Sequence, residues 1–123
     1  MVIVATDCPL DSRQLKRLAA RGVLGMARTG AQGGHSSGDY FIAFSTSYRR
    51  TAGQTDEVFF SSRLLRDESQ LTPLLAATAE AVEEAILNSI LKAVTVEGRD
   101  RNISRALDLE EMFSAFRRHG KLV

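Results

Sequence analysis

Residues 2–5, Val-Ile-Val-Ala, form an unbroken apolar run in which three of the four side chains are β-branched. A strand without alternation of apolar and polar residues is typical of the middle of a sheet, where both faces are covered. Residues 40–44, Tyr-Phe-Ile-Ala-Phe, form a second run of this kind. Because strands at chain ends usually fray, we expect an oligomeric neighbour or upstream chain to cover residues 1–5.

Between these two runs the apolar spacing becomes helical. Residues 10–29 carry apolar or small residues at every third or fourth position, which predicts an amphipathic helix. Gly22 and Gly25 lower its helix propensity, so we expect them to let another element approach closely. The apolar side consists of Leu15, Leu18, Ala19, Gly22, Val23 and Met26, and the opposite side, with Arg13, Lys16, Arg17 and Arg21, is predicted to be solvated.

The middle of the chain predicts one more strand and a long helix. Residues 58–60, Val-Phe-Phe, are expected to pair with residues 40–44 as a hairpin. Thr72 and Pro73 are a helix-start signal, because threonine caps a helix and proline at the first helical position loses no hydrogen bond. We expect this helix to run to about residue 93 and to pack on two sides.

The end of the chain predicts a short strand and a last helix. Residues 94–98 are expected to form an edge strand, and residues 98–102 a charged turn. Asp108 and Glu111 have the spacing of a capping box, and Gly120 is a typical helix stop. Together with the two buried strands, this pattern predicts an α/β fold.

Length, composition and charge exclude several classes of protein. The chain has 123 residues, 44% hydrophobic and 25% charged, which is typical of one globular unit spanning residues 1–123. Its net charge of +1 creates no field that would attract nucleic acid or an anionic membrane. The single Cys8 fits a reducing compartment and is interpreted as a packing residue. With no signal-peptide pattern and no apolar stretch of about 20 residues, a cytoplasmic protein is expected.

Residues 30–39, Gly-Ala-Gln-Gly-Gly-His-Ser-Ser-Gly-Asp, are the candidate functional loop. The loop lacks the Gly-Lys-Ser/Thr ending of a phosphate-binding loop and follows a helix rather than a strand, which disfavours nucleotide binding. His35 has serines and a carboxylate beside it, but members of a catalytic triad rarely lie so close in sequence. His35 and His119 lack the spacing of a metal site. No metal or cofactor is predicted.

Asp39 and Ser37 are the remaining candidates in this loop. They lie two residues apart at the mouth of a buried strand, so a strand geometry places both side chains on one face. Such a pair could orient a third group.

The order of these segments resembles that of the DmpA-like aminopeptidases, a family that includes β-peptidyl aminopeptidases and L-aminopeptidase/D-esterases. The resemblance extends over nearly the whole chain. It rests on Val-Ile-Val-Ala-Thr-Asp-Cys-Pro-Leu (2–10), Gln-Leu-Lys-Arg-Leu-Ala-Ala-Arg (14–21), Ala-Arg-Thr-Gly (27–30), His-Ser-Ser-Gly-Asp (35–39), Phe-Ile-Ala-Phe-Ser-Thr (41–46), Val-Glu-Glu-Ala-Ile-Leu-Asn (82–88) and Val-Glu-Gly-Arg-Asp (96–100).

The resemblance implies an N-terminal-nucleophile hydrolase that is made as one precursor and cuts itself in two. It implies a layered α-β-β-α sandwich, to which this chain supplies central strands and about three helices as the downstream (β) subunit. The nucleophilic serine would directly precede Met1, and Ser37 and Asp39 match the serine and acidic residue that orient it. The upstream (α) subunit would supply the oxyanion donors and most of the pocket for a peptide or amino-acid amide or ester, in an oligomer of heterodimers.

The sequence departs from this pattern at its first position. Residue 1 is methionine, so the chain as written is expected to be inactive alone. Two alternatives stay open. One is a non-catalytic scaffold or assembly subunit, derived from a gene fragment or a pseudoenzyme, and the other is a related acyltransferase with an N-terminal threonine.

Overall fold

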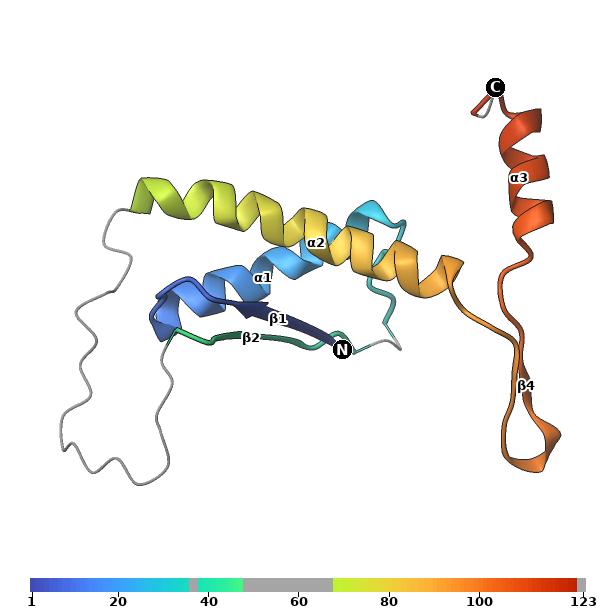
Figure 1. Cartoon of the computed structure of the whole chain (residues 1–123), viewed down its shortest axis with the longest axis horizontal. Helices are drawn as coiled ribbons and strands as arrows, with labels where there is room; N and C mark the ends of the chain where they lie inside the picture. Colours follow the sequence, from blue (N-terminus) through green and yellow to red (C-terminus); the bar gives the residue numbers. More distant parts are fainter. Residues whose placement is uncertain (36–37, 48–67, 122–123) are drawn as a thin grey trace. The chain divides into compact units, whose positions relative to one another are not determined.

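Residues 1–35, 38–47 and 68–121 are described by the computed structural model of the chain (Figure 1). They belong to two compact units, Met1–Glu84 and Ala85–Val123, each of which is described by itself. The strand expected at residues 58–60 lies outside the described residues. That the chain acts as one unit of a larger aminopeptidase stays a prediction.

The first unit is built on two parallel strands, β1 (Val2–Thr6) and β2 (Phe41–Ser45). Val2 lies opposite Phe41, and hydrogen bonds extend the ladder past both ends of β2. The N–H of Val2 donates to the carbonyl oxygen of Tyr40 at 2.8 Å, and that of Thr46 donates to Thr6 at 2.8 Å. Both strand predictions are confirmed to within one residue at each end.

Helix α1 (Ser12–Arg28) connects the two strands, and it is preceded by a cap that sequence reasoning missed. The N–H of Gln14 donates to Asp11 Oδ1 at 2.7 Å, and the N–H of Asp11 donates to Gln14 Oε1 at 3.1 Å. This reciprocal capping box satisfies two backbone donors that the helix itself leaves unpaired. The helix therefore begins at Ser12 rather than at residue 10.

Helix α2 (Leu71–Leu91) follows a short 3-10 helix, Glu68–Gln70. The prediction that Thr72 caps this helix was wrong, because Thr72 and Pro73 already lie within its first turn. Proline is tolerated there since the first N–H groups of a helix have no intrahelical partner. The buried residues of α2 form one stripe, and the expected second packed side is not found among the described residues: Leu71, Leu75, Thr78, Ala79 and Val82 are buried.

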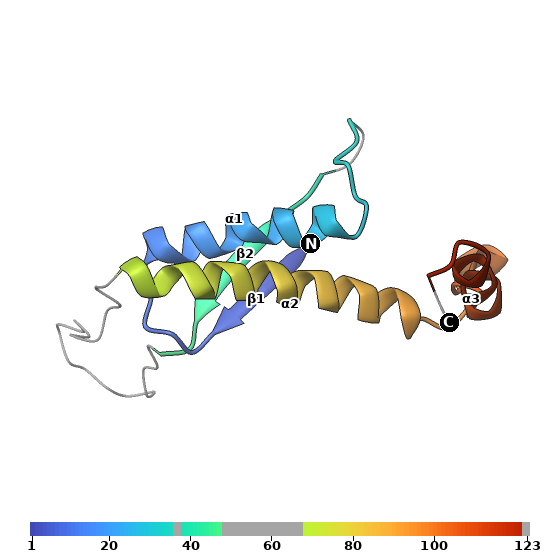
Figure 2. The same ribbon diagram turned by 90° about the horizontal axis from the view of Figure 1, so that it is seen from above.

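The core of the first unit lies between the strands and these helices. Helices α1 and α2 lie on the same side of the strand pair (Figures 1 and 2). The buried leucines are joined by partly buried residues of both strands, Val4 and Ala43. These leucines are Leu10, Leu18, Leu71 and Leu75.

The strands are covered on one face only within the described residues. Burial alternates along both strands, and Ile3, Ile42 and Phe44 on the second face are 62%, 51% and 45% exposed. This differs from the expectation of strands covered on both faces. The physical reason is that every described element packed on this sheet lies on its helical side.

Gly22 and Gly25 are both buried, and the predicted close approach at these positions is confirmed. A Cβ atom on Gly22 would lie 2.5 Å from the ring of Phe41. One on Gly25 would overlap the carbonyl oxygen of Ala79 and lie 2.9 Å from Val82 Cβ. The absence of a side chain thus brings α1 against β2 at one glycine and against α2 at the other.

The second unit contains a hairpin and helix α3 (Leu109–Arg118). Strands β3 (Val96–Glu97) and β4 (Ile103–Ser104) pair antiparallel across the turn Arg99–Arg101, as the charged-turn prediction indicated. Asp108 caps α3, its Oδ1 accepting from the N–H of Glu111 at 3.0 Å. Gly120 follows the helix with φ of 63°, which confirms the predicted stop. None of the helices in the described part of the chain is long and apolar enough to cross a membrane.

Gly25→Val tests the close contact of α1 with α2. The added side chain must displace the backbone of α2, because its nearest neighbours include the carbonyl oxygen of Ala79. Overpacking of this kind costs about 1–3 kcal/mol. We expect the free energy of unfolding of the complete protein, measured by chemical denaturation, to fall by this amount.

Gly34→Val is the control, since a Cβ at Gly34 meets nothing within 4 Å. We expect it to change stability by less than about 0.5 kcal/mol. Equal effects of the two substitutions would contradict the importance of the helix contact.

Candidate active site

Asp39 lies two residues before β2, at the edge of the sheet where β1 also begins. Because β1 and β2 are parallel, their amino ends meet at the same edge. The hydrogen bond from the N–H of Val2 to Tyr40 fixes that edge. Asp39 is therefore held close to the position of Met1, although the two residues are far apart in sequence.

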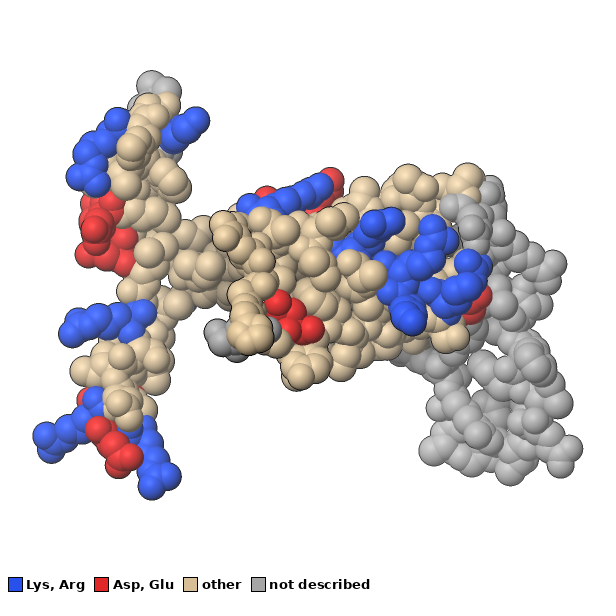
Figure 3. Space-filling view, turned by 180° about the vertical axis from the view of Figure 1, so that it is seen from behind, with Lys and Arg blue, Asp and Glu red and all other residues tan. Residues whose placement is uncertain are grey.

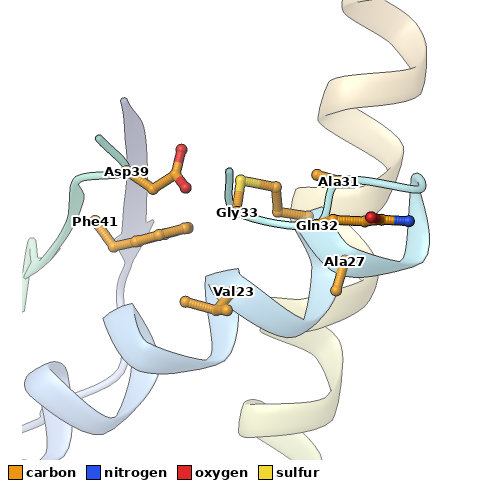
Figure 4. Close-up of a pocket in the computed structure, with 8 residues that line it drawn as sticks. Val23, Ala27, Ala31, Gln32, Gly33, Asp39 and Phe41 are labelled. Atoms are coloured by element: carbon orange, nitrogen blue, oxygen red, sulfur yellow. The ribbon is translucent and has the colours of Figure 1, made fainter. Parts of the chain in front are cut away.

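A cavity of about 330 Å³ opens beside Asp39 (Figure 4). Its walls come from the last turns of α1, from the loop that follows and from the start of β2. In Figure 4, the carboxylate of Asp39 points across the opening towards the loop at Gly33. The cavity is lined by Val23, Met26, Ala27, Ala31, Gln32, Gly33, Asp39 and Phe41.

The cavity is lined mainly by apolar side chains, with one carboxylate, that of Asp39, at its mouth. An ionised carboxylate only accepts hydrogen bonds, so Asp39 can hold an N–H or O–H donor. Phe41 and Val23 offer apolar surface next to it. The arrangement suits a group that combines a polar donor with an aliphatic part.

His35 and His119 are not among the residues that line this cavity. Ser37 lies outside the described residues, and His35 is an exposed residue of the loop. His119 follows α3 in the second unit. Among residues 1–35, 38–47 and 68–121, no three potential metal-ligating side chains come together.

Cys8 has the structural role that the sequence indicated. It is half-buried against the leucine core, and its carbonyl oxygen accepts a hydrogen bond from Ser45 Oγ at 2.6 Å. The bond ties the end of β1 to the end of β2.

The wall residues of the cavity were missed at the level of sequence. Phe41 follows Asp39 by two residues and so shares its face of the strand. Val23, Met26 and Ala27 have the spacing of one helix face. Both signals were present, but only the fold shows that the strand and the helix face each other.

The chain matches known proteins over nearly all of its length. Residues 1–104 match the model of peptidase family S58. The β-peptidyl aminopeptidase BapA of Sphingosinicella microcystinivorans is 34% identical over 122 residues, covering 99% of this chain and 30% of the relative. BapA of Sphingosinicella xenopeptidilytica is 33% identical over 100 residues, covering 80% of this chain and 24% of the relative.

Solved structures agree in fold. The L-aminopeptidase D-Ala-esterase/amidase of Ochrobactrum anthropi, described as a variant of the Ntn hydrolase fold, superposes with a TM-score of 0.80 at 35% identity. The match covers 99% of this chain and 34% of that one. A Pyrococcus horikoshii protein gives 0.79 at 44% identity, covering 98% of this chain and 34% of that one.

The chain thus spans about a third of the length of its relatives. The predicted layered α/β fold of the DmpA-like type is confirmed, with three helices and few strands in this part of it. The family model, the identities to aminopeptidases and the shared fold lead to one conclusion: the chain belongs to peptidase family S58, the family of the DmpA-like serine aminopeptidases.

Proposed function

We propose that this chain is the downstream part of an aminopeptidase that hydrolyses N-terminal amide bonds of short peptides, or amino-acid amides and esters. The nucleophile is a serine that directly precedes Met1 in the complete protein. The relatives support the substrate class, since they include a β-peptidyl aminopeptidase and an L-aminopeptidase D-Ala-esterase/amidase.

The parallel register of β1 and β2 carries the proposal. Val2 pairs with Phe41, so one step back along both strands pairs Met1 with Tyr40. One further step places the residue before Met1 opposite Asp39. In a parallel ladder, paired residues share a face, and here it is the face that α1 covers. A serine at that position would therefore lie at the mouth of the cavity beside Asp39.

The mechanism follows from the chemistry of a terminal serine. An α-amino group has a pKa of about 7.7–8.0, so a useful fraction is neutral at pH 7 and can accept the proton of its own hydroxyl. The serine oxygen attacks the amide carbon, and the proton passes to the leaving amine as the amide bond breaks. Water then hydrolyses the acyl-enzyme. The oxyanion donors belong to the upstream part of the protein.

Asp39 and Ser37 act as positioning residues in this mechanism. The carboxylate of Asp39 is placed to accept a hydrogen bond from the serine hydroxyl or from the terminal amine. Ser37 precedes Asp39 by two residues and completes the pair that holds the nucleophile. No cofactor or metal enters the reaction.

The upstream (α) subunit of the same precursor is proposed to cover the open face of the sheet. Ile3, Ile42 and Phe44 are apolar and exposed there, and an exposed apolar sheet face is typical of an interface. The subunit pairs would then associate into an oligomer.

Asp39→Asn tests the role of the carboxylate in the complete, processed enzyme. The amide keeps the size of the side chain but removes its charge and one acceptor. We expect kcat to fall about a hundredfold or more, with KM and the melting temperature little changed. The matched control is Asp7→Asn at the opposite end of β1, whose exposed side chain is remote from the cavity. Unchanged turnover in Asp39→Asn would remove Asp39 from the mechanism.

Ser37→Ala tests whether the two positioning residues act together. The effects of residues that act as a unit are strongly non-additive. The double variant Ser37→Ala/Asp39→Asn should therefore be only slightly less active than the less active of the two single variants. Steady-state kinetics of the two single variants and the double variant give the comparison. Losses that multiply would mean that the two residues act independently.

The intact mass and N-terminal sequence of the protein from its natural source test the nucleophile. We expect a chain that starts with serine directly before Met1, accompanied by a larger partner. Threonine at that position would favour the acyltransferase alternative. A lone chain that starts at Met1 would favour a non-catalytic scaffold.

A further inference from the structure

The cavity beside Asp39 has the size of a pocket for one amino-acid residue. Its volume of about 330 Å³ lies near the lower end of the range for small-molecule sites, which is roughly 300–1,000 Å³. It therefore has room for a single residue rather than for a longer stretch of peptide. This size suits an aminopeptidase, in which one residue lies on the acyl side of the bond that is cut.

The walls of the cavity are mostly neutral and apolar. Val23, Met26 and Ala27 form the wall on α1, and Asp39 is the only ionisable residue among those that line the cavity. In Figure 4, the amide of Gln32 points away from Asp39. A charged group pressed against the α1 wall would lose its water without gaining a partner, which is unfavourable. The walls therefore suit a neutral aliphatic group.

The basic side chains of the first unit do not change this electrostatic setting. Those near the amino end of α1 form a blue group in Figure 3. None of the described lysines or arginines lines the cavity, so none would offset a negative charge bound there. The basic residues of this part of α1 are Arg13, Lys16, Arg17 and Arg21.

The ring of Phe41 forms the wall of the cavity on the sheet side. In Figure 4, it extends from β2 towards the middle of the opening. The ring packs on Gly22, where an added Cβ atom would lie only 2.5 Å away. Because Gly22 has no side chain that could give way, the ring cannot move closer to α1. The cavity is therefore not expected to widen on this side.

We propose that the cavity binds the side chain of the residue whose carbonyl carbon the serine attacks, and that its walls select neutral aliphatic side chains. This inference rests on the proposed function, because the strand register places the serine opposite Asp39 at the mouth of the cavity. The side chain of the acyl residue then extends from Asp39 towards the wall on α1. Asp39 would repel an acidic side chain, and a basic one would bring its charge against apolar surface.

Ala27→Phe tests the pocket in the complete, processed protein. Ala27 is exposed, so a larger side chain at this position fills part of the cavity without repacking a core. Hydrolysis is compared for leucine amide against glycine amide, and for β-homoleucine amide against β-alanine amide. We expect the ratio of kcat/KM for the larger to the smaller substrate to fall about tenfold or more, since one methylene changes discrimination by about 10- to 200-fold.

The matched control is Ala20→Phe, because Ala20 is another exposed alanine of α1 and does not line the cavity. We expect it to leave the ratio unchanged. Val23→Ala is the reciprocal variant, since it removes two methyl groups from the wall at a position that is 44% exposed. It should raise kcat/KM for phenylalanine amide relative to leucine amide about threefold or more.

The results separate this inference from the proposed function. If the unsubstituted protein hydrolyses neither series of amides, the proposed function fails and the pocket fails with it. If it hydrolyses them but neither Ala27→Phe nor Val23→Ala shifts the ratios, the pocket assignment is wrong and the proposed function stands. A lower melting temperature of Ala27→Phe with an unchanged ratio would mean that another part of the protein fills the cavity, which also overturns the assignment.

Discussion

Two parallel strands that are neighbours in a sheet oblige the chain between them to return to the edge from which it started. Helix α1 is that return in this protein, and the rest of the first unit depends on how closely it can lie against the sheet. Gly22 lets it contact the ring of Phe41, and Gly25, three residues further along the helix, lets α2 approach it closely. These contacts set the distance of α1 from β2 and from α2, and so they shape both the leucine core and the cavity beside Asp39.

The elements whose signals are local could be predicted from the sequence. The β-branched run at residues 2–5 and the helical spacing of α1 depend only on near neighbours along the chain, and both were located closely. The start of α2 was misplaced because Thr72-Pro73 is compatible with two positions in a first turn, and local chemistry does not choose between them. The capping box of Asp11 with Gln14 was missed although its spacing was present.

The candidate site divides in the same way. Asp39 was proposed because it lies two residues from Ser37 at the mouth of a buried strand, and because it matches a residue of the family pattern. The structure places a cavity beside it, and its catalytic role stays a prediction. The wall formed by Val23 and Phe41 could not be found, because it requires knowledge of which helix face meets which strand. Coverage of the second sheet face is also beyond the sequence of this chain, which spans about a third of the length of its relatives. The family relationship relates this chain to the longer proteins that it matches.

The hydrogen bond between Val2 and Tyr40 has a consequence for a precursor that is cut ahead of Met1. A newly made chain end normally gains freedom, and the entropy of that freedom would carry a reactive group away from its neighbours. Here the β1–β2 ladder holds the strand from its second residue onwards. If the proposed precursor is cut ahead of Met1, the new terminal amine would therefore stay close to Asp39, because the sheet already restricts the motion of the strand that carries it.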